Sequence, residues 1–166
     1  MKNHSVIAVV FTKNRQEVLL IKRRDVPVWV LPGGGIEKDE TALGAIIREV
    51  KEESGFEVKI VKKIGEYTPV NKLSKFTYLF ECEIVSGEAA SSSESSDVKF
   101  FEVKKLPKLI PPPYPMWIED GLKNEKEVIQ KKLFQVNYLE LIKQFFFHPI
   151  LIVRFLLSKI GITINT

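Results

Sequence analysis

Apolar residues in this chain first fall into runs that are typical of β-strands. Residues 5–11 form a β-branched apolar run, and residues 17–22 form the return strand of a predicted hairpin after a polar turn. Residues 75–85 alternate apolar and polar side chains most clearly, and residues 98–103 form another apolar run. We therefore expect a sheet in which several strands are buried.

A longer strand is predicted over residues 56–67, with a break in the alternation at Ile60 and Val61 that indicates a β-bulge. The loop at 68–74 follows it and is placed to reach over a substrate. The loop at 86–96 is rich in Ser, Glu, Ala and Gly, and it is predicted to be mobile.

The hydrophobic period changes to that of a helix between the three glycines at 33–35 and Gly55. Thr41 is the predicted N-cap of this helix. One face is expected to pack on the sheet through Leu43, Ile46, Ile47 and Val50. Further helical segments are predicted to pack Trp117, Ile118 and Leu122 on the sheet, and to span residues 125–144.

Three carboxylates are predicted to stand on the opposite face of the first helix. Glu49, Glu52 and Glu53 lie at i, i+3 and i+4, and such positions share one face of an α-helix. Like charges so close repel one another, and a cation between them relieves the repulsion. An all-oxygen site suits a hard ion such as Mg²⁺ or Mn²⁺. The spacing therefore predicts a divalent metal site.

The stretch from Gly34 to Phe56 also resembles the signature box of the Nudix hydrolases. The matching positions are Gly34, Glu40, Arg48, Glu49, Val50, Lys51, Glu52, Glu53, Ser54, Gly55 and Phe56. The resemblance implies an α/β fold, an α/β/α sandwich with a mixed sheet, that hydrolyses a nucleoside diphosphate linked to another moiety. We expect a Nudix domain over residues 1–125 and a C-terminal helical extension over residues 126–166, packed on the domain or on a partner.

The resemblance also assigns roles within the box. The metal ligands would be the three glutamates and a glycine carbonyl: Glu49, Glu52, Glu53, and Gly33 or Gly34. Glu40 and Arg48 would form an ion pair that ties the loop to the helix and do no chemistry. Mg²⁺ is the expected cofactor, with Mn²⁺ as the alternative.

The catalytic base is left open among three carboxylates. Glu52 and Glu53 come from the box, and Glu94 comes from the loop before the last core strand, with Asp97 as second choice there. A solvated loop acid is the alternative interpretation of Glu94. A nearby carboxylate is needed because hydrolysis of a pyrophosphate requires a base for the attacking water.

Three residues before the box are candidates for substrate binding. Arg23 and Arg24 stand at a strand end, where a guanidinium could hold a phosphate in a bidentate contact. A solvated strand end is the alternative for either arginine. Trp29 could stack on a base or sugar, although packing within the fold is favoured for it.

Charge and cysteine content narrow the classes of function. The net charge is +4, but residues 1–122 carry 18 basic and 18 acidic side chains, so the positive excess lies in residues 123–166. A neutral body argues against a broad nucleic-acid-binding face. Cys82 is the single cysteine, which fits a reducing, cytoplasmic location and a packing role in an apolar strand.

Residues 145–160 are strongly apolar but contain Pro149 and Arg154. A membrane-spanning helix needs about 20 mostly apolar residues, so a span is not expected. A helix packed on the domain or across a homodimer is favoured, and an interfacial membrane helix is the alternative.

The substrate stays open at this point. A nucleotide sugar or an ADP-ribose type compound is slightly favoured, and house-cleaning of a (deoxy)nucleoside triphosphate is the alternative. A silent nucleotide-binding sensor on the same scaffold is a further alternative, although the intact glutamates argue against it.

Overall fold

Two sheets form the centre of the protein in the computed structural model, which describes residues 4–159. The larger sheet has the order β4-β1-β6-β5-β8 and consists of Gly33–Gly35, His4–Val10, Phe76–Gly87, Phe56–Pro69 and Ile129–Leu133. The smaller has the order β3-β2-β7 and consists of Trp29–Val30, Glu17–Arg23 and Ser95–Glu102. The larger sheet is mixed, because β1 runs parallel to β6 and β5 parallel to β8, while the other neighbours are antiparallel.

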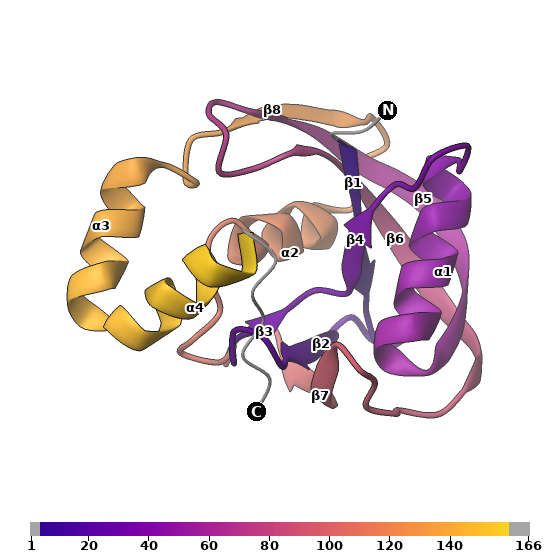
Figure 1. Ribbon diagram of the computed structural model, residues 1–166. Coiled ribbons are helices and arrows are strands. Elements are labelled where there is room, and N and C mark those ends of the chain that lie inside the picture. Colours follow the sequence, from indigo (N-terminus) through magenta and orange to yellow (C-terminus); the bar gives the residue numbers. More distant parts are fainter. Residues whose placement is uncertain (1–3, 160–166) are drawn as a thin grey trace.

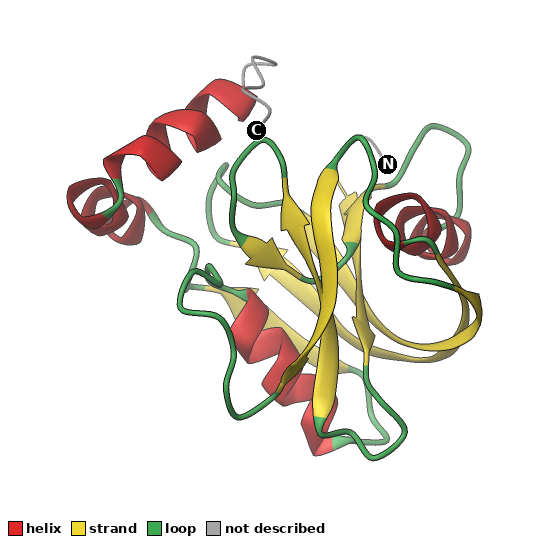
Figure 2. Ribbon diagram, turned by 90° about the horizontal axis from the view of Figure 1, so that it is seen from below, coloured by secondary structure: helices red, strands yellow, loops and turns green. Residues whose placement is uncertain are grey.

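Helices α1 (Ala42–Ser54) and α2 (Tyr114–Lys123) cover opposite faces of the sheets (Figures 1 and 2). Helix α1 packs its residues Ala45, Ile46 and Val50 against one core, and α2 places Trp117 and Ile118 in the other. The predicted α/β/α sandwich with a mixed sheet is confirmed. Leu122 of α2, however, is 37% exposed rather than buried.

The central strands are buried on both sides. In β1, Val6, Ala8 and Val10 point into the α1 core, while Ile7 and Val9 point into the α2 core. Cys82 of β6 lies in the α1 core at 2% exposure, and burial raises the pKa of its thiol to about 12. A thiol with so high a pKa stays protonated, so the structure supports the predicted packing role for Cys82.

The predicted hairpin between the first two strands is wrong. β1 and β2 belong to different sheets and are joined by a single bridge between Phe11 and Val18. Before that bridge β1 pairs with β6, and after it β2 pairs with β7. The two segments are adjacent in the sequence, and this favoured a hairpin. In the structure, each of them instead pairs with a strand that lies far away in the sequence. The predicted bulge in β5 is present as a register shift between Ile60 and Lys62.

Helix α1 begins and ends where its capping residues indicate. The Thr41 side chain accepts a hydrogen bond from the Gly44 amide, and Gly55 closes the helix at φ 80°. The predicted apolar face is partly wrong, because Leu43 and Ile47 are 54% and 41% exposed. The helix is rotated so that a different stripe faces inward, and the buried α1 residues are Ala45, Ile46, Glu49, Val50, Glu53 and Ser54.

The predicted helix over residues 125–144 is also wrong in its first half. Residues Ile129–Leu133 form β8, which pairs parallel with β5 and buries Leu133 completely. The edge of β5 offers unpaired backbone groups, and satisfying them outweighs a weak helical pattern. Only then do α3 (Tyr138–Phe147) and α4 (Pro149–Lys159) follow. Strand β8 thus belongs to the larger sheet although it lies beyond residue 125, and the division of the chain into a domain and an extension stays a prediction.

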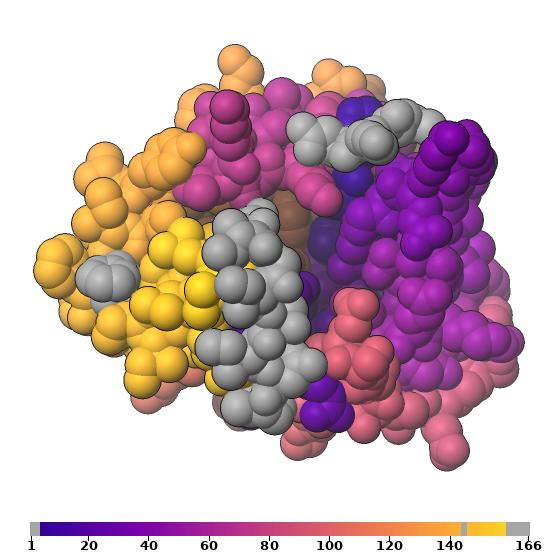
Figure 3. Space-filling view, in the orientation of Figure 1, coloured from indigo at the N-terminus to yellow at the C-terminus, as the bar shows by residue number. Residues whose placement is uncertain are grey.

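Helices α3 and α4 leave many large apolar side chains in contact with solvent, and Figure 3 shows this segment in orange and yellow along one side of the molecule. The most exposed of them are Leu139, Phe146, Phe147 and Ile150, at 70–78%. Within residues 4–159, no helix has the length and apolar character needed to cross a membrane. Residues 160–166 of the predicted extension lie outside the described residues.

Candidate active site

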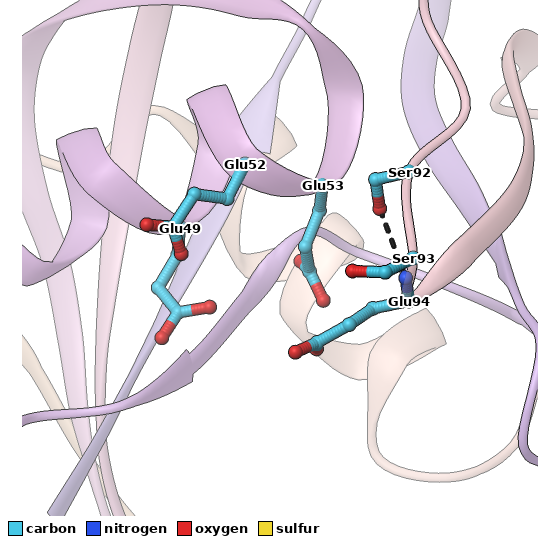
Figure 4. A pocket seen from close by; sticks show the side chains of 6 residues that line it. All are labelled: Glu49, Glu52, Glu53, Ser92, Ser93 and Glu94. Atoms are coloured by element: carbon cyan, nitrogen blue, oxygen red, sulfur yellow. Dashed lines mark hydrogen bonds between the residues drawn. The ribbon is translucent and has the colours of Figure 1, made fainter.

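A polar pocket of about 210 Å³ lies where the last turns of α1 face the loop before β7. Its lining consists of Glu49, Glu52, Glu53, Ser92, Ser93 and Glu94. Figure 4 shows the side chains of Glu53 and Glu94 pointing toward each other from the two sides of the pocket. The fold therefore brings together the three box glutamates and the loop glutamate that the sequence singled out.

Glu53 is the most buried of these carboxylates, at 3% exposure. Its Oε2 accepts a hydrogen bond of 2.7 Å from the Gly33 amide. This bond directs the Glu53 side chain from α1 toward β4. Burial raises the pKa of Glu53 to about 8, and the nearby negative charge of Glu49 adds to the rise. The site therefore disfavours the charged form of Glu53 unless a cation lies close to it.

Gly34 makes room for Glu49. A Cβ atom at Gly34 would stand 2.6 Å from the Glu49 carboxylate, much closer than van der Waals contact allows. Neighbouring Gly33 has φ +147°, and a Cβ there would meet the backbone oxygen of Val6 at 2.2 Å. Burial also raises the pKa of Glu49, although its bond to Arg48 works in the opposite direction. The glycines thus allow strand β4 to approach the carboxylate face of α1.

Arg48 organises the outer side of the site. It binds Glu40 through two hydrogen bonds of 2.9 Å, so the predicted ion pair between loop and helix is present. The same guanidinium donates to Glu49 at 2.9 Å and to Glu52 at 3.1 Å, and it reaches the Gly35 carbonyl at 3.2 Å. Glu52 is the most exposed box glutamate, with 60% of its side chain accessible.

The donor set fits a hard divalent cation in its chemistry, since four carboxylates line one pocket and two of them have raised pKa values. Their side chains are not yet arranged as ligands: among residues 4–159, no three acidic, histidine or cysteine side chains converge as a metal site would require. Arg48 holds Glu49 and Glu52, and the Gly33 amide holds Glu53. Each of these bonds uses one carboxylate oxygen, so the second oxygen of Glu49, Glu52 and Glu53 stays available to a cation.

The loop carrying Glu94 is tied to α1, contrary to the mobile loop that its composition predicted. The Ser95 hydroxyl donates to the Glu53 carbonyl at 2.5 Å, and the Ala90 amide donates to the Ser54 carbonyl at 3.0 Å. The hydroxyl of Ser92 accepts hydrogen bonds from the backbone amides of Glu94 and Ser95, at 3.1 and 3.0 Å. The serines that look like a flexible linker in the sequence instead close a compact turn.

Asp97 was the second choice for the loop carboxylate. It lies within β7 and pairs with Lys99 at 2.6 Å, and it does not line the pocket. The structure therefore places Glu94, and not Asp97, beside the box glutamates. Sequence reasoning did not single out Ser92 or Ser93, and no motif marks these pocket residues within the serine-rich run.

The predicted substrate-binding residues all contact protein groups. Arg23 forms a two-bond pair with Asp25, at 2.8 and 2.6 Å. Arg24 donates its Nε to the Ser92 carbonyl at 2.8 Å. Trp29 packs edge-to-face on Phe101, with ring centroids 4.7 Å apart. These contacts show what each residue does within the fold, and their roles toward a substrate remain predictions.

Comparison with known proteins identifies the family. The NUDIX domain model matches residues 1–120 of this chain. The chain belongs to the Nudix family. The match includes the whole of α1 and its preceding loop, and it ends before β8 and the two C-terminal helices.

Relatives of known name differ in the substrate that the name gives. A Bacillus subtilis (strain 168) protein named as an 8-oxo-dGTP diphosphatase is 34% identical over 121 residues, covering 72% of this chain and 80% of that protein. An ADP-ribose pyrophosphatase of Methanocaldococcus jannaschii is 32% identical over 114 residues, covering 64% of this chain and 67% of that protein.

Solved structures show the same fold. The crystal structure of an ADP-ribose pyrophosphatase from Streptococcus suis superposes with a TM-score of 0.63 at 21% identity, covering 80% of this chain and 99% of that one. A UDP-X diphosphatase gives a TM-score of 0.66 at 19% identity, covering 79% and 67%. The protein is thus a Nudix hydrolase that acts on phosphoanhydride bonds, in a family that generally requires a divalent metal and acts on small nucleotide substrates.

Proposed function

We propose that this Nudix hydrolase is a Mg²⁺-dependent pyrophosphohydrolase that cleaves a nucleoside diphosphate linked to another moiety, of the nucleotide-sugar or ADP-ribose type. The observation that carries the proposal is the pocket in which Glu49, Glu52 and Glu53 face Glu94 across the end of α1. The names of the Methanocaldococcus jannaschii and Streptococcus suis proteins support the substrate class.

The residues that would hold the cation are Glu49, Glu52 and Glu53, with a backbone carbonyl of Gly33 or Gly34. When bound, the cation would neutralise charge on the diphosphate and lower the pKa of a water molecule. The Gly33 amide keeps the Glu53 carboxylate directed toward the pocket, and Gly34 leaves the space that the Glu49 carboxylate needs.

We propose Glu94 as the base that accepts the proton of the attacking water. It stands opposite the box glutamates and is exposed to solvent, on a turn that the fold fixes in place. Glu52 and Glu53 are the alternative bases. The choice can be tested because a base and a metal ligand respond differently to substitution: loss of the base lowers kcat alone, whereas loss of a ligand also weakens metal binding.

Glu94→Gln should therefore lower kcat while Mn²⁺ affinity, measured by calorimetry, stays unchanged. Glu53→Gln should reduce both. Glu88→Gln is the matched control, since Glu88 is an exposed glutamate of the same loop that does not line the pocket. Equal kcat for Glu94→Gln and the wild type would return the role of base to Glu52 or Glu53.

A second candidate substrate is an oxidised deoxynucleoside triphosphate. The observation that favours it is the 34% identity to the Bacillus subtilis protein named as an 8-oxo-dGTP diphosphatase. Reaction chemistry in the pocket would be the same, because both substrates present a phosphoanhydride bond. The two substrates would differ only in the group attached to the phosphates, which would lie outside the pocket.

A substrate screen separates these candidates. ADP-ribose, nucleotide sugars and dinucleoside polyphosphates are incubated with Mg²⁺ or Mn²⁺ and alkaline phosphatase, and triphosphates including 8-oxo-dGTP are incubated with inorganic pyrophosphatase. Phosphate release is the readout, and the Glu53→Gln protein is the blank for contaminating enzymes. Turnover of ADP-ribose or a nucleotide sugar above the triphosphates supports the main proposal, and the reverse order supports the second. No turnover by the wild type would overturn both in favour of a nucleotide sensor.

A further inference from the structure

Helix α4 reaches back to the loop between β2 and β3, as its position beside β3 in Figure 1 shows. Arg154 of this helix donates its Nε to the Asp25 carbonyl at 2.8 Å and its Nη2 to the Arg24 carbonyl at 3.0 Å. The two acceptors are consecutive backbone carbonyls, and the donor lies about 130 residues further along the chain. This contact joins the C-terminal helices to the domain at a defined point.

Arg24, one of the two residues whose carbonyls bind Arg154, also forms hydrogen bonds with the loop that lines the pocket. The Arg24 amide donates to the Glu94 carbonyl at 2.9 Å, and the Arg24 Nε donates to the Ser92 carbonyl at 2.8 Å. Ser92 and Glu94 both line the pocket. A chain of hydrogen bonds therefore runs from α4 through Arg24 to the backbone that carries the Glu94 side chain.

We propose that Arg154 is a positioning residue for hydrolysis: by holding the backbone of Arg24 and Asp25, it keeps Glu94 opposite Glu53. The rate of the enzyme then depends on a helix that lies beyond the residues matched by the family model. The catalytic consequence rests on the proposed function, because it requires a role for Glu94 in the reaction. The structural consequence, a loop held in place by α4, does not.

An arginine suits this task better than a lysine. The planar guanidinium presents several N–H groups in a fixed fork, so one side chain can reach two neighbouring carbonyls in set directions. A lysine ammonium at the same place keeps the charge, but it cannot reproduce the fork. Arg154→Lys should therefore lie between the wild type and Arg154→Ala.

The test uses the full-length variants Arg154→Ala and Arg154→Lys. Lys143→Ala is the matched control, because Lys143 is a basic residue of α3 that forms an ion pair with the nearby Glu140. Hydrogen–deuterium exchange is measured at the amides of residues 92–95, with β1 and β6 as internal references. The kinetic constants are measured on the substrate that the screen identifies.

Arg154→Ala should speed exchange at residues 92–95 and leave β1 and β6 as in the wild type. It should lower kcat about tenfold, because a small displacement of a reacting group is costly in rate. The change should appear mainly in kcat, since a mispositioned base affects the transition state more than substrate binding. Lys143→Ala should match the wild type in both measurements.

A coupling measurement checks that the effect passes through Arg24. If Arg24→Ala and Arg154→Ala act on the same path, the double variant should lose less kcat than the product of the two single losses. Independent, multiplying losses would overturn the branch through the Arg24 side chain and Ser92, because Arg24→Ala keeps the backbone amide that binds the Glu94 carbonyl.

Unchanged exchange at residues 92–95 in Arg154→Ala would overturn the proposal itself, whether or not a substrate has been found. If Arg154→Ala also exposes β1 and β6, Arg154→Lys decides the question: faster loop exchange with protected strands supports the proposal, and wild-type loop exchange overturns it. Faster loop exchange with unchanged kcat would keep the contact but remove Glu94 from the reaction, which separates this inference from the proposed function.

Discussion

Large apolar side chains have opposite surroundings in the two parts of this molecule. In the part that contains the two sheets, strand residues such as Leu19 and Leu79 are completely buried between two helical layers. In α3 and α4, Phe146 and Phe147 are both 78% exposed, although both helices are rich in apolar residues. A strand in the sandwich receives a partner on each face, whereas among the described residues α3 packs on α4 and α4 bonds to the loop between β2 and β3.

This difference shows that apolar character alone does not decide burial. A side chain is buried where the chain supplies a complementary second layer, and the sandwich supplies that layer for β1, β2 and β6. Arg154 of α4 forms hydrogen bonds with the loop between β2 and β3, and no described residue of α3 or α4 belongs to either of the two buried cores. Substitutions in the sandwich and substitutions in α3 and α4 should therefore change activity and stability to very different extents.

The largest expected contrast is in activity. Glu53→Gln should lower kcat by about two to three orders of magnitude, because it removes a negatively charged ligand from the site. The fold should be retained, since a glutamine can still accept the Gly33 hydrogen bond. Steady-state kinetics with Mg²⁺ and a thermal unfolding curve check the two parts of this prediction. A Glu53→Gln enzyme with near-normal kcat would contradict the assignment of the site.

The next contrast is in stability. Leu79→Ala should lower the free energy of unfolding by about 2–5 kcal/mol, because it leaves a cavity in a fully buried core. Urea unfolding followed by circular dichroism measures the change. A loss below about 1 kcal/mol would mean that the core between β6 and α2 is less well packed than its burial indicates.

Asp120 should make stability depend on pH. Burial alone would raise the pKa of this carboxyl, but hydrogen bonds from Lys123, Lys131 and Tyr67 lower it below its usual range. A lowered folded-state pKa stabilises the protein above the unfolded-state value of about 3.9, and this stabilisation is lost as the pH falls through the folded-state pKa.

Asp120→Asn should therefore cost about 1–3 kcal/mol at pH 7, and the gap from the wild type should narrow in acid. Urea unfolding of both proteins at pH 7 and below pH 4 tests this. Because both lysines are partly exposed, added salt should reduce the gap as well. A gap that does not vary with pH would show that Asp120 contributes through shape rather than charge.

A smaller effect is expected at the glycine strand. Gly34→Ala should weaken Mn²⁺ binding about tenfold, because the new methyl group occupies the space of the Glu49 carboxylate. Gly35→Ala is the control, since the nearest atom to its new Cβ would be Lys75 Nζ at 3.8 Å. Calorimetric titration with Mn²⁺ compares the two variants. Equal affinity would mean that Glu49 does not hold the metal.

The smallest effect should come from the exposed helices. Phe146→Ser should change the free energy of unfolding by no more than about 0.5 kcal/mol, because Phe146 is already 78% exposed. Urea unfolding under the conditions used for Leu79→Ala gives the direct comparison. A loss of several kcal/mol would show that α3 is covered in solution, by a second copy or by another surface.

Much of the site could be predicted from local sequence, because its determinants are local. Thr41 and Gly55 bound α1, and the helical repeat then places Glu49, Glu52 and Glu53 within two turns of one another. The ion pair of Glu40 with Arg48 likewise depends on residues only eight positions apart. Repeat, caps and short-range pairing are properties of a segment, and they survive in any fold that keeps the helix.

The tertiary structure decided which side of a segment faces inward and which faces solvent. It turned Leu43 and Ile47 to solvent and Glu49 and Glu53 inward, since the rotation of α1 depends on the sheet beneath it. It made β8 a strand, because the edge of β5 needed a hydrogen-bonding partner. It also brought Arg154 to Arg24 and Arg24 to Glu94. These contacts join residues about 70 to 130 positions apart, and only the completed fold determines which distant backbone groups meet.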